Sequence, residues 1–290
     1  LESDTLLRKL VVKEIRSDAT RHGDQRRTLI QPAAMASRAE VPTVADEAVT
    51  LIVSDKGWAR VRQGHGLDLS GVVFKDGDGP GSTHECRSVD SLVIISSEGR
   101  AFTVPISSLP DGRGMGAPLP SFIEIGAGKI AHVLIGKPED ELLVAKSSGY
   151  GFVCTFGDLL SRQKAGKAFL SMEVGATVLP PAPIVRNAGM DHIAALSSDG
   201  RLLVFPLDQM KRLSGGKGVQ IIGLKGKETL KSIIAGKGPS VSIKGTFRNK
   251  LKTLLSEEKH VGQRARRGAT VGLVNQPEIA YPKAEEPGAK

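Results

Sequence analysis

The sequence is poor in the residues that mark several classes of protein. Aromatic residues make up 4% of its 290 residues, and only two residues are cysteines. Two cysteines exclude a disulfide framework and suit a reducing compartment. With so few aromatic side chains, the hydrophobic cores must be built from Val, Ile, Leu and Ala.

Apolar runs long enough to cross a membrane are also missing, because none approaches the roughly 20 residues of a spanning helix. The sequence starts at Leu1 without a signal-like segment. These two observations predict a cytoplasmic protein with no membrane partner, and a fragment of a longer chain.

Metal-binding and catalytic motifs are absent as well. The six histidines and two cysteines form no CxxC, HxxxH or HExxH spacing, which argues against a zinc site. The stretch Gly216-Lys217-Gly218 lacks the hydroxyl residue and the earlier glycine of a P-loop. Asp191 and His192 lie on an expected strand without a nucleophile elbow. We therefore expect no metal, no cofactor and no catalytic residue in this chain.

What the sequence does contain is a repeat. Five times a short apolar run reaches a turn with glycine and continues into a second apolar run, which predicts a β-hairpin. The turn glycines are Gly57, Gly99, Gly149, Gly200 and, in a weaker copy, Gly238, at intervals of 42, 50, 51 and 38 residues. Such intervals suit blades of about four strands arranged radially. Because one hairpin cannot bury its apolar face alone, the repeats predict an all-β array in which each blade covers its neighbour.

Positive charge is concentrated in the last three repeats. Residues 141–290 carry 23 Lys and Arg against 12 Asp and Glu, a net charge of +11. Residues 49–140 have a net charge of −2, and residues 1–48 have a net charge of zero. A solubilising surface would not require this asymmetry. It predicts a polyanionic partner, with nucleic acid as the leading candidate.

Basic loops that contain glycine follow the hairpins at a regular place. They cover residues 111–116, 162–168 and 211–218, and the fifth repeat adds a later basic loop at residues 264–268. In a radial array such loops would present their cations along one rim, where glycine lets the backbone approach a phosphate. The alternative for any one loop is a solvated turn. The candidate nucleic-acid contacts are Arg162, Lys164, Lys167, Lys211, Arg212, Lys217, Arg266 and Arg267, with Lys250, Lys252 and Arg264 from the fifth repeat and Arg60, Arg62 and Arg113 as outlying ones.

The remaining parts of the chain have their own signals. Residues 3–22 predict a helix that starts at Ser3 or Asp4 and stops at Gly23, so residues 1–30 are expected to be the end of a longer helical segment. Residues 31–47 predict a linker, and residues 48–275 the repeat body. Residues 276–290, with three prolines, predict a disordered tail.

The third repeat resembles a known family. The stretch Ser148-Gly-Tyr-Gly-Phe-Val-Cys-Thr-Phe156, followed by Asp158-Leu-Leu-Ser-Arg162 and Ala165-Gly-Lys-Ala168, is similar to the C-terminal domain found in the A subunits of bacterial DNA topoisomerase IV. Further stretches fit the same domain, namely Gly57-Trp58, Gly112-Arg-Gly114, Val204-Phe-Pro206 and Arg266-Arg-Gly268. The resemblance covers residues 15–275. It implies a five-bladed β-pinwheel, a propeller-like disc whose blades exchange strands.

The resemblance also implies a non-catalytic role. The family's catalytic tyrosine lies in an upstream domain beside an arginine, a context that neither Tyr150 nor Tyr281 has. The chain would then be a monomeric, sequence-independent domain that binds and bends duplex DNA and orients the transported segment for decatenation and supercoil relaxation. ATP and Mg²⁺ would serve only the whole topoisomerase IV enzyme, which would be associated with the bacterial chromosome. Its protein partners would be the rest of the A subunit, together with the B subunit of the same enzyme.

A departure from a related family bears on DNA wrapping. The C-terminal domain of gyrase A carries a Gln-Arg-Arg-Gly-Gly-Lys-Gly-like box tied to wrapping, whereas the corresponding Arg62-Gln-Gly-His-Gly66-Leu-Asp here is far less basic. The stretch Gln263-Arg-Ala-Arg-Arg-Gly268 is only an echo of that box. Binding and bending are therefore expected without full wrapping. The alternative is a protein-interaction propeller, a scaffold for another subunit or for a regulator, which the more acidic residues 49–140 would suit.

Overall fold

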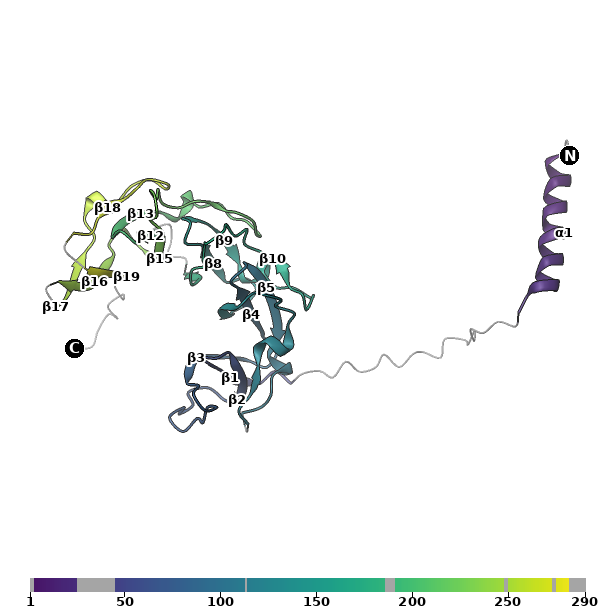
Figure 1. Ribbon diagram of the computed structural model, residues 1–290, viewed down its shortest axis with the longest axis horizontal. Helices are drawn as coiled ribbons and strands as arrows, with labels where there is room; N and C mark the ends of the chain where they lie inside the picture. The colour runs from purple at the N-terminus through teal and green to yellow at the C-terminus, as the bar shows by residue number, and fades with distance from the viewer. Residues whose placement is uncertain are drawn as a thin grey trace. The chain divides into compact units, whose positions relative to one another are not determined.

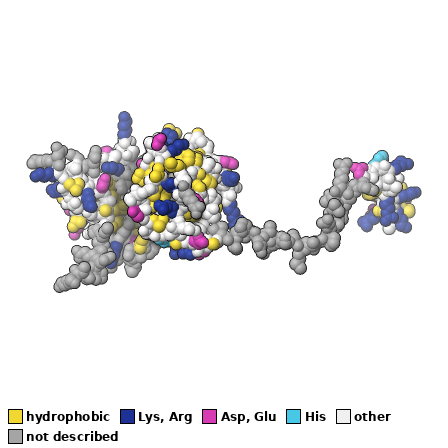
Figure 2. Space-filling model, turned by 90° about the horizontal axis from the view of Figure 1, so that it is seen from below, with side chains coloured by type: hydrophobic (Ala, Val, Ile, Leu, Met, Phe, Trp, Pro, Cys, Tyr) yellow, Lys and Arg dark blue, Asp and Glu magenta, His cyan; other side chains and the backbone are white. Residues whose placement is uncertain are grey.

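The computed structural model describes residues 3–24, 45–112, 114–185, 191–247, 250–272 and 275–281. The chain divides into two compact units, Leu1–Thr43 and Val44–Lys290. The first contains helix α1 (Asp4–His22), which confirms the helix predicted over residues 3–22. Its end is marked by the Gly23 N–H, which donates to the Ala19 carbonyl at 3.0 Å. No residue of α1 is buried, and Lys and Arg side chains stand out from it in Figure 2.

The second unit is built from five antiparallel sheets, which confirms the all-β, five-bladed prediction. Four sheets combine a hairpin, the strand that follows it, and a two-residue strand donated by the next repeat. In spatial order the first sheet is β3 (Pro80–Arg87), β1 (Ala48–Ser54), β2 (Trp58–Gln63) and β6 (Ala117–Pro118), and the second is β10 (Lys167–Ala168), β5 (Arg100–Pro105), β4 (Ser91–Ser96) and β7 (Ile130–Ile135).

The third and fourth sheets follow the same plan. The third is β11 (Ala182–Ile184), β8 (Glu141–Ala145), β9 (Tyr150–Thr155) and β14 (Val219–Gln220), and the fourth is β15 (Leu230–Lys237), β12 (Asp191–Ser197), β13 (Arg201–Pro206) and β18 (Ala269–Thr270). The fifth has three strands among the described residues, β17 (Lys250–Leu255), β16 (Ser242–Phe247) and β19 (Asn275–Ala280). Short 3₁₀ helices complete the list: η1 (Ile106–Ser108), η2 (Leu119–Phe122), η3 (Phe156–Leu159), η4 (Leu207–Gln209) and η5 (Glu258–His260).

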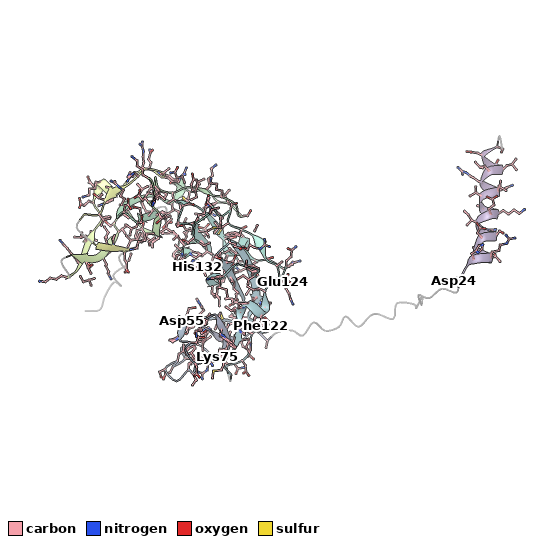
Figure 3. The ribbon with its side chains drawn as sticks, viewed as in Figure 1. Asp24, Asp55, Lys75, Phe122, Glu124 and His132 are labelled. Carbon is pink, nitrogen blue, oxygen red and sulfur yellow. The ribbon has the colours of Figure 1, made fainter. Side chains whose placement is uncertain are left out.

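We call β6, β10, β14 and β18 the exchange strands, and residues 111–116, 161–166, 211–218 and 261–268, which lead to them, the exchange loops. Within the second unit the sheets follow one another along an arc (Figure 1). The exchange strands lie on its outer side, as the succession β18, β13, β12 and β15 from outside to inside shows (Figure 1). Glu124 likewise lies on the outer side and His132 of β7 nearer the inside (Figure 3). The exchange strands therefore form outer edges of successive sheets.

Apolar residues fill both faces of the central strands. In β4, Leu92 and Ile94 pack towards the first sheet, and Val93 and Ile95 pack towards the third. The strands β8 and β12 alternate in the same way between their two neighbours. Because successive side chains of a strand point to opposite faces, two covered faces require a continuous apolar run. Each fully buried Leu or Ile contributes about 1.5–3 kcal/mol to folding.

Each exchange strand is entered through a glycine that the fold requires. Gly116, Gly166, Gly218 and Gly268 directly precede the exchange strands and have φ between +61° and +86°. A Cβ atom at any of them would lie 2.5 Å from a carbonyl oxygen of the preceding sheet. Only glycine combines this left-handed backbone with so close an approach. The four glycines therefore set where each repeat joins its predecessor.

The two ends of the array differ. Residues 64–79 cover the free face of the first sheet, where the Thr50 hydroxyl donates to the Gly64 carbonyl at 2.6 Å and Ile52 shares a cavity with Phe74. On the fifth sheet, Leu251 and Leu255 of β17 are 77% and 63% exposed. Among the described residues no exchange strand joins the fifth sheet to the first.

The fifth hairpin lies further along the chain than predicted. Residues 230–237 form β15, which pairs with β12 as the last strand of the fourth sheet. The hairpin is β16–β17, and Gly238 lies in the connection between two sheets. The prediction was wrong because an apolar run, a glycine and a second apolar run also describe two strands that belong to neighbouring sheets. Lys250 and Lys252 consequently lie on β17, and not in a loop equivalent to the others.

The predicted disordered tail is wrong for its first residues. β19 pairs with β16, with Ile279 opposite Ile243, and both side chains are buried. The Tyr281 hydroxyl donates to the His192 carbonyl of the fourth sheet at 2.9 Å. Pro277 fits here because β19 is an edge strand, where a missing N–H breaks no ladder. Residues 282–290 lie outside the described residues, as do 25–44 of the predicted helical end and linker.

The third sheet contains a buried cation. Three residues before the turn glycine, the other four-stranded sheets have serine and the third has Lys146, which is fully buried. Its Nζ lies 2.8 Å from one Glu173 carboxylate oxygen and donates to the Ser171 carbonyl, and the Ser148 hydroxyl donates to Glu173 at 3.0 Å. Burial raises the pKa of Glu173, but the hydrogen bonds from Lys146 and Ser148 outweigh it and hold this pKa below its usual value.

Glu173→Gln is expected to destabilise the chain by about 3 kcal/mol, the low end of the cost of breaking a buried ion pair, because Glu173 itself is 38% exposed. The pKa of Glu173 is lowered in the folded state. The pair therefore contributes fully above about pH 4.5, and this contribution is lost as the pH falls through the folded pKa. Urea unfolding from pH 7 to pH 3.5 would measure the free energy of unfolding of the variant and of the unmodified chain. The difference between these two free energies should become smaller in acid.

The exposed Glu98 provides the control, since Glu98→Gln should change stability by less than about 0.5 kcal/mol. If the loss in free energy of unfolding caused by Glu173→Gln stayed constant over the whole pH range, this account of Lys146 would be contradicted.

Gly268→Ala should destabilise the chain more than Gly226→Ala. Both glycines have left-handed φ, +71° and +59°, so each alanine costs about 1–2 kcal/mol for its backbone conformation. Only at Gly268 does the added Cβ also meet a carbonyl oxygen, that of Leu202, while nothing lies within 4 Å of a Cβ at Gly226. Thermal unfolding would measure both. Equal losses of Tm would show that the close approach of the exchange strand is not a constraint.

Candidate nucleic-acid interface

Each exchange loop starts and ends on the same strand of the preceding sheet. Parallel bridges mark the start, with Val61 opposite Asp111, Val153 opposite Arg212, and Val204 opposite Val261. In the second sheet the Ser161 N–H donates to the Thr103 hydroxyl at 2.8 Å. Each exchange strand then pairs with the first two residues of the same strand, which is β2, β5, β9 or β13. Successive blades therefore hold their loops at equivalent places.

Four of the predicted cations on these loops and beside them are exposed and lack a side-chain partner among the described residues. They are Arg162 and Lys164 before β10, Lys211 before β14, and Arg266 before β18. The three loops belong to successive repeats, and their exchange strands lie on the outer side of the arc. The structure thus brings these four cations to equivalent edges of three neighbouring sheets. Lys167, on β10 itself, is half-buried.

Other predicted cations are engaged in holding the loops. Arg212 pairs with Glu141, although its side chain is still 58% exposed. Lys217 lies 3.9 Å from Glu173 and 4.7 Å from the centre of the Tyr150 ring. These contacts join an exchange loop to the sheet that receives it.

The last exchange loop has two such cations. The Arg264 guanidinium donates to the Gln220 carbonyl at 2.6 Å, and its backbone N–H donates to the Gln209 side chain at 2.8 Å. Arg267 lies 3.5 Å from Glu228, whose side chain is fully buried. Both arginines are therefore less available to a ligand than Arg266.

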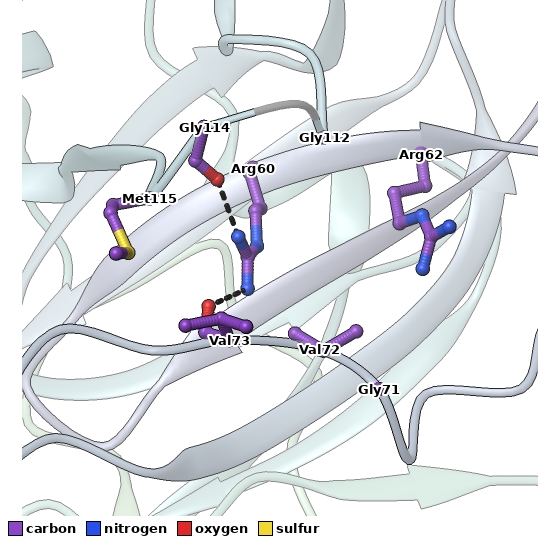
Figure 4. Close-up of a pocket in the computed structure, with 8 residues that line it drawn as sticks. All are labelled: Arg60, Arg62, Gly71, Val72, Val73, Gly112, Gly114 and Met115. Atoms are coloured by element: carbon purple, nitrogen blue, oxygen red, sulfur yellow. Dashed lines mark hydrogen bonds between the residues drawn. The ribbon is translucent and has the colours of Figure 1, made fainter.

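Arg60 is not a surface cation. It is 6% exposed, and its guanidinium donates to the Gly114 carbonyl and, at 2.6 Å, to the Val73 carbonyl (Figure 4). Its prediction as an outlying contact is therefore wrong, because the guanidinium is used inside the first sheet. Arg62 is exposed and shares with Arg60 a pocket of about 300 Å³ (Figure 4). Arg113 lies outside the described residues.

The first two sheets present a mixed surface. Seen from the end occupied by the first sheet, hydrophobic side chains gather in the middle of the unit and charged side chains of both signs surround them (Figure 2). This agrees with the net charge of −2 over residues 49–140. The positive charge of the chain is thus concentrated on the later sheets.

Two arginines outside the predicted set contact the exchange loops. Arg100 is the first residue of β5 and Arg201 the first of β13. Arg100 donates to the Ala165 and Gly166 carbonyls, and Arg201 donates to the Gly268 carbonyl at 3.1 Å. The signal was present in the sequence, because arginine follows the turn glycine in both repeats.

The described residues offer no cluster suited to a metal ion, since no three His, Cys, Asp or Glu side chains among them are grouped closely enough to hold one. Within the same residues no helix is both long and apolar enough to span a bilayer. Cys86 and Cys154 are buried, and burial raises the pKa of the Cys154 thiol to about 12, so this thiol stays protonated.

Comparison with known proteins adds an independent line. The family described as DNA gyrase C-terminal domain, beta-propeller, matches residues 90–116 and 191–236. The chain is 39% identical to the A subunit of DNA topoisomerase 4 from Neisseria gonorrhoeae, over 83% of this chain and 32% of that protein. It is 33% identical to the equivalent protein of Escherichia coli K12, over 99% of this chain and 40% of that one. The chain thus spans about a third to two-fifths of the length of these curated relatives.

A solved structure agrees with these relatives. The structure of the E. coli ParC C-terminal domain superposes with a TM-score of 0.74 and 33% identity, over 81% of this chain and 100% of that one.

Proposed function

The chain belongs to the family of C-terminal domains of the A subunits of DNA topoisomerase 4, and from this premise we propose that its second unit binds duplex DNA through the phosphate backbone, along the exchange loops. The observation that carries the proposal is the recurrence of exposed cations on the equivalent exchange loops of three successive repeats, with no side-chain partner among the described residues. Arg162, Lys164, Lys211 and Arg266 are the contacts we assign first. Arg212 is a further contact, since its side chain is 58% exposed beside Glu141.

Backbone contacts explain why charge and not a motif is the dominant signal. Lys and Arg that neutralise phosphates release counterions and bind any sequence, whereas base reading needs an element that enters a groove. The exchange loops are short and both of their ends are fixed on one strand. They suit contact with a backbone that passes across the edges of the sheets.

Binding along an arc would bend the DNA. Curving a site of about 20–30 base pairs costs of order 1–6 kcal/mol, which several charge contacts can offset. In the whole enzyme such a domain would orient the DNA segment that is transported during decatenation and supercoil relaxation, working with the rest of the A subunit and with the B subunit. Cleavage, ATP and Mg²⁺ would belong to other parts of that enzyme, which acts on the chromosome in the cytoplasm. This chain would act as a monomer and without a cofactor.

Reversing two cations tests the interface. The double variant Lys211→Glu and Arg266→Glu should bind random-sequence duplex more weakly, with a loss that does not depend on sequence. If about six phosphates are contacted, the slope of log affinity against log salt is near −5 for the unmodified chain. It should become shallower by about 2 in the variant. Gel-shift titrations of the 290-residue chain at several salt concentrations would measure both quantities.

The matched control is Lys129→Glu with Lys137→Glu, which changes the charge equally at exposed positions just before and just after β7. It should leave the salt slope nearly unchanged. Equal losses in the two double variants would show that net charge alone drives binding. Undetectable binding of the unmodified chain at low salt would instead favour the protein-interaction scaffold.

A further inference from the structure

Arginines from the receiving sheet donate hydrogen bonds to backbone carbonyls of the exchange loops, at the same place in two repeats. In the second sheet, Arg100 Nη2 donates to the Ala165 carbonyl at 2.6 Å and to the Gly166 carbonyl at 3.0 Å, while Nε donates to Ala165 at 3.1 Å. In the fourth sheet, Arg201 Nη1 donates to the Gly268 carbonyl at 3.1 Å. Gly166 and Gly268 are equivalent residues, the left-handed glycines before β10 and β18.

The other two sheets secure the same place by other means. In the first sheet the buried Arg60 donates to the Gly114 carbonyl, two residues before the equivalent glycine Gly116. In the third sheet, Tyr150 stands where Arg100 and Arg201 stand. There the loop supplies the cation, because Lys217, next to Gly218, lies over the Tyr150 ring at 4.7 Å. All four exchange loops are thus attached to the receiving sheet by a cation at their C-terminal end.

This attachment lies next to the exposed cations. The loop gripped by Arg100 carries Arg162 and Lys164, and the loop gripped by Arg201 carries Arg266. Hydrogen bonds from a guanidinium to two adjacent carbonyls fix a loop more strongly than neutral ones, because the donor is charged and forked. A loop fixed in this way loses less conformational freedom when its cations bind a ligand.

We propose that Arg100 and Arg201 are positioning residues for DNA binding, which hold the exchange loops so that the loop cations, and not these arginines, meet the phosphates. The inference rests on the proposed function of these loops. The competing explanation is that Arg100 and Arg201 contact phosphates themselves. A lysine variant distinguishes these explanations, because lysine keeps the charge but cannot form the forked contact. Lysine should therefore replace an arginine that contacts phosphate, but not one that positions the loop.

The test compares Arg100→Lys and Arg100→Gln in the 290-residue chain, with random-sequence duplex as the probe. Both variants should bind about three- to tenfold more weakly, which lies in the lower part of the range that coupling within one hydrogen-bond network produces. Both should be cleaved faster by trypsin after Arg162 and Lys164, since the loop that carries these sites is released. Affinity of Arg100→Lys equal to that of the unmodified chain would overturn the proposal.

A double-mutant cycle separates positioning from direct contact. In a chain that carries Arg162→Gln and Lys164→Gln, the further change Arg100→Gln should have little effect on affinity, because the loop then has no cations left to position. An undiminished effect in that background would mean that Arg100 binds phosphate directly, and would overturn the proposal.

Arg87→Gln serves as the control for lost charge. Arg87 lies on β3 and pairs with Asp46, away from every exchange loop, so its variant should change neither the affinity nor the trypsin cleavage of residues 161–166. The proposed function and the positioning role of Arg100 can be overturned separately. If the unmodified chain did not bind duplex, the proposed function and the role in DNA binding would both fall. The trypsin rates would still decide whether Arg100 holds the loop.

Discussion

The structure depends on the exchange of two-residue strands between neighbouring sheets. Each of the first four sheets is completed by residues that belong to the next repeat, and a left-handed glycine with no space for a side chain sets the point of entry. A strand that is entered at one fixed residue cannot slide, so its register and the loop before it are fixed together. The same exchange that joins the sheets therefore also places the basic loops on the outer side of the arc.

Two kinds of cation share these loops, and their partners separate them. Lys217 contacts the Glu173 carboxylate and the Tyr150 ring, Arg264 donates to a carbonyl of the third sheet, and Arg267 lies beside the buried Glu228 carboxylate. Arg162, Lys211 and Arg266 have no such partner among the described residues and stay exposed. Charge on the loops therefore has two effects, since the engaged cations attach the loop and the others give it a positive surface. Counting Lys and Arg along the sequence cannot separate these effects.

Much of the fold could be predicted because the burial of both faces of a sheet leaves a strong local pattern. Runs such as residues 92–95 and 142–145 are continuously apolar, and the glycine after each run marks the hairpin turn. The fifth hairpin could not be located in this way, because residues 230–237 have the same pattern but pair with β12. For the tail, the prolines misled, although the alternation of Pro277, Ile279 and Tyr281 was visible. The exchange glycines, about 50 residues apart, were a further signal.

The candidate site was less predictable, because whether a cation is paired, buried or exposed depends on residues from another repeat. The buried Arg60 guanidinium donates to the carbonyls of residues 73 and 114, which no local sequence pattern relates to Arg60. Arg100 and Arg201 were missed because they lie on the strands that receive the loops and not on the basic loops themselves.

The central claim is that cations of successive exchange loops meet one DNA duplex together. Acetylation of lysines in the 290-residue chain, compared with and without random-sequence duplex at low salt and read by mass spectrometry, tests this directly. The account predicts that DNA protects both Lys164 and Lys211, which belong to different repeats, while Lys129 and Lys137 react as before. If Lys164 and Lys211 stayed fully reactive in the bound chain, or only one of them were protected, the shared interface would be contradicted.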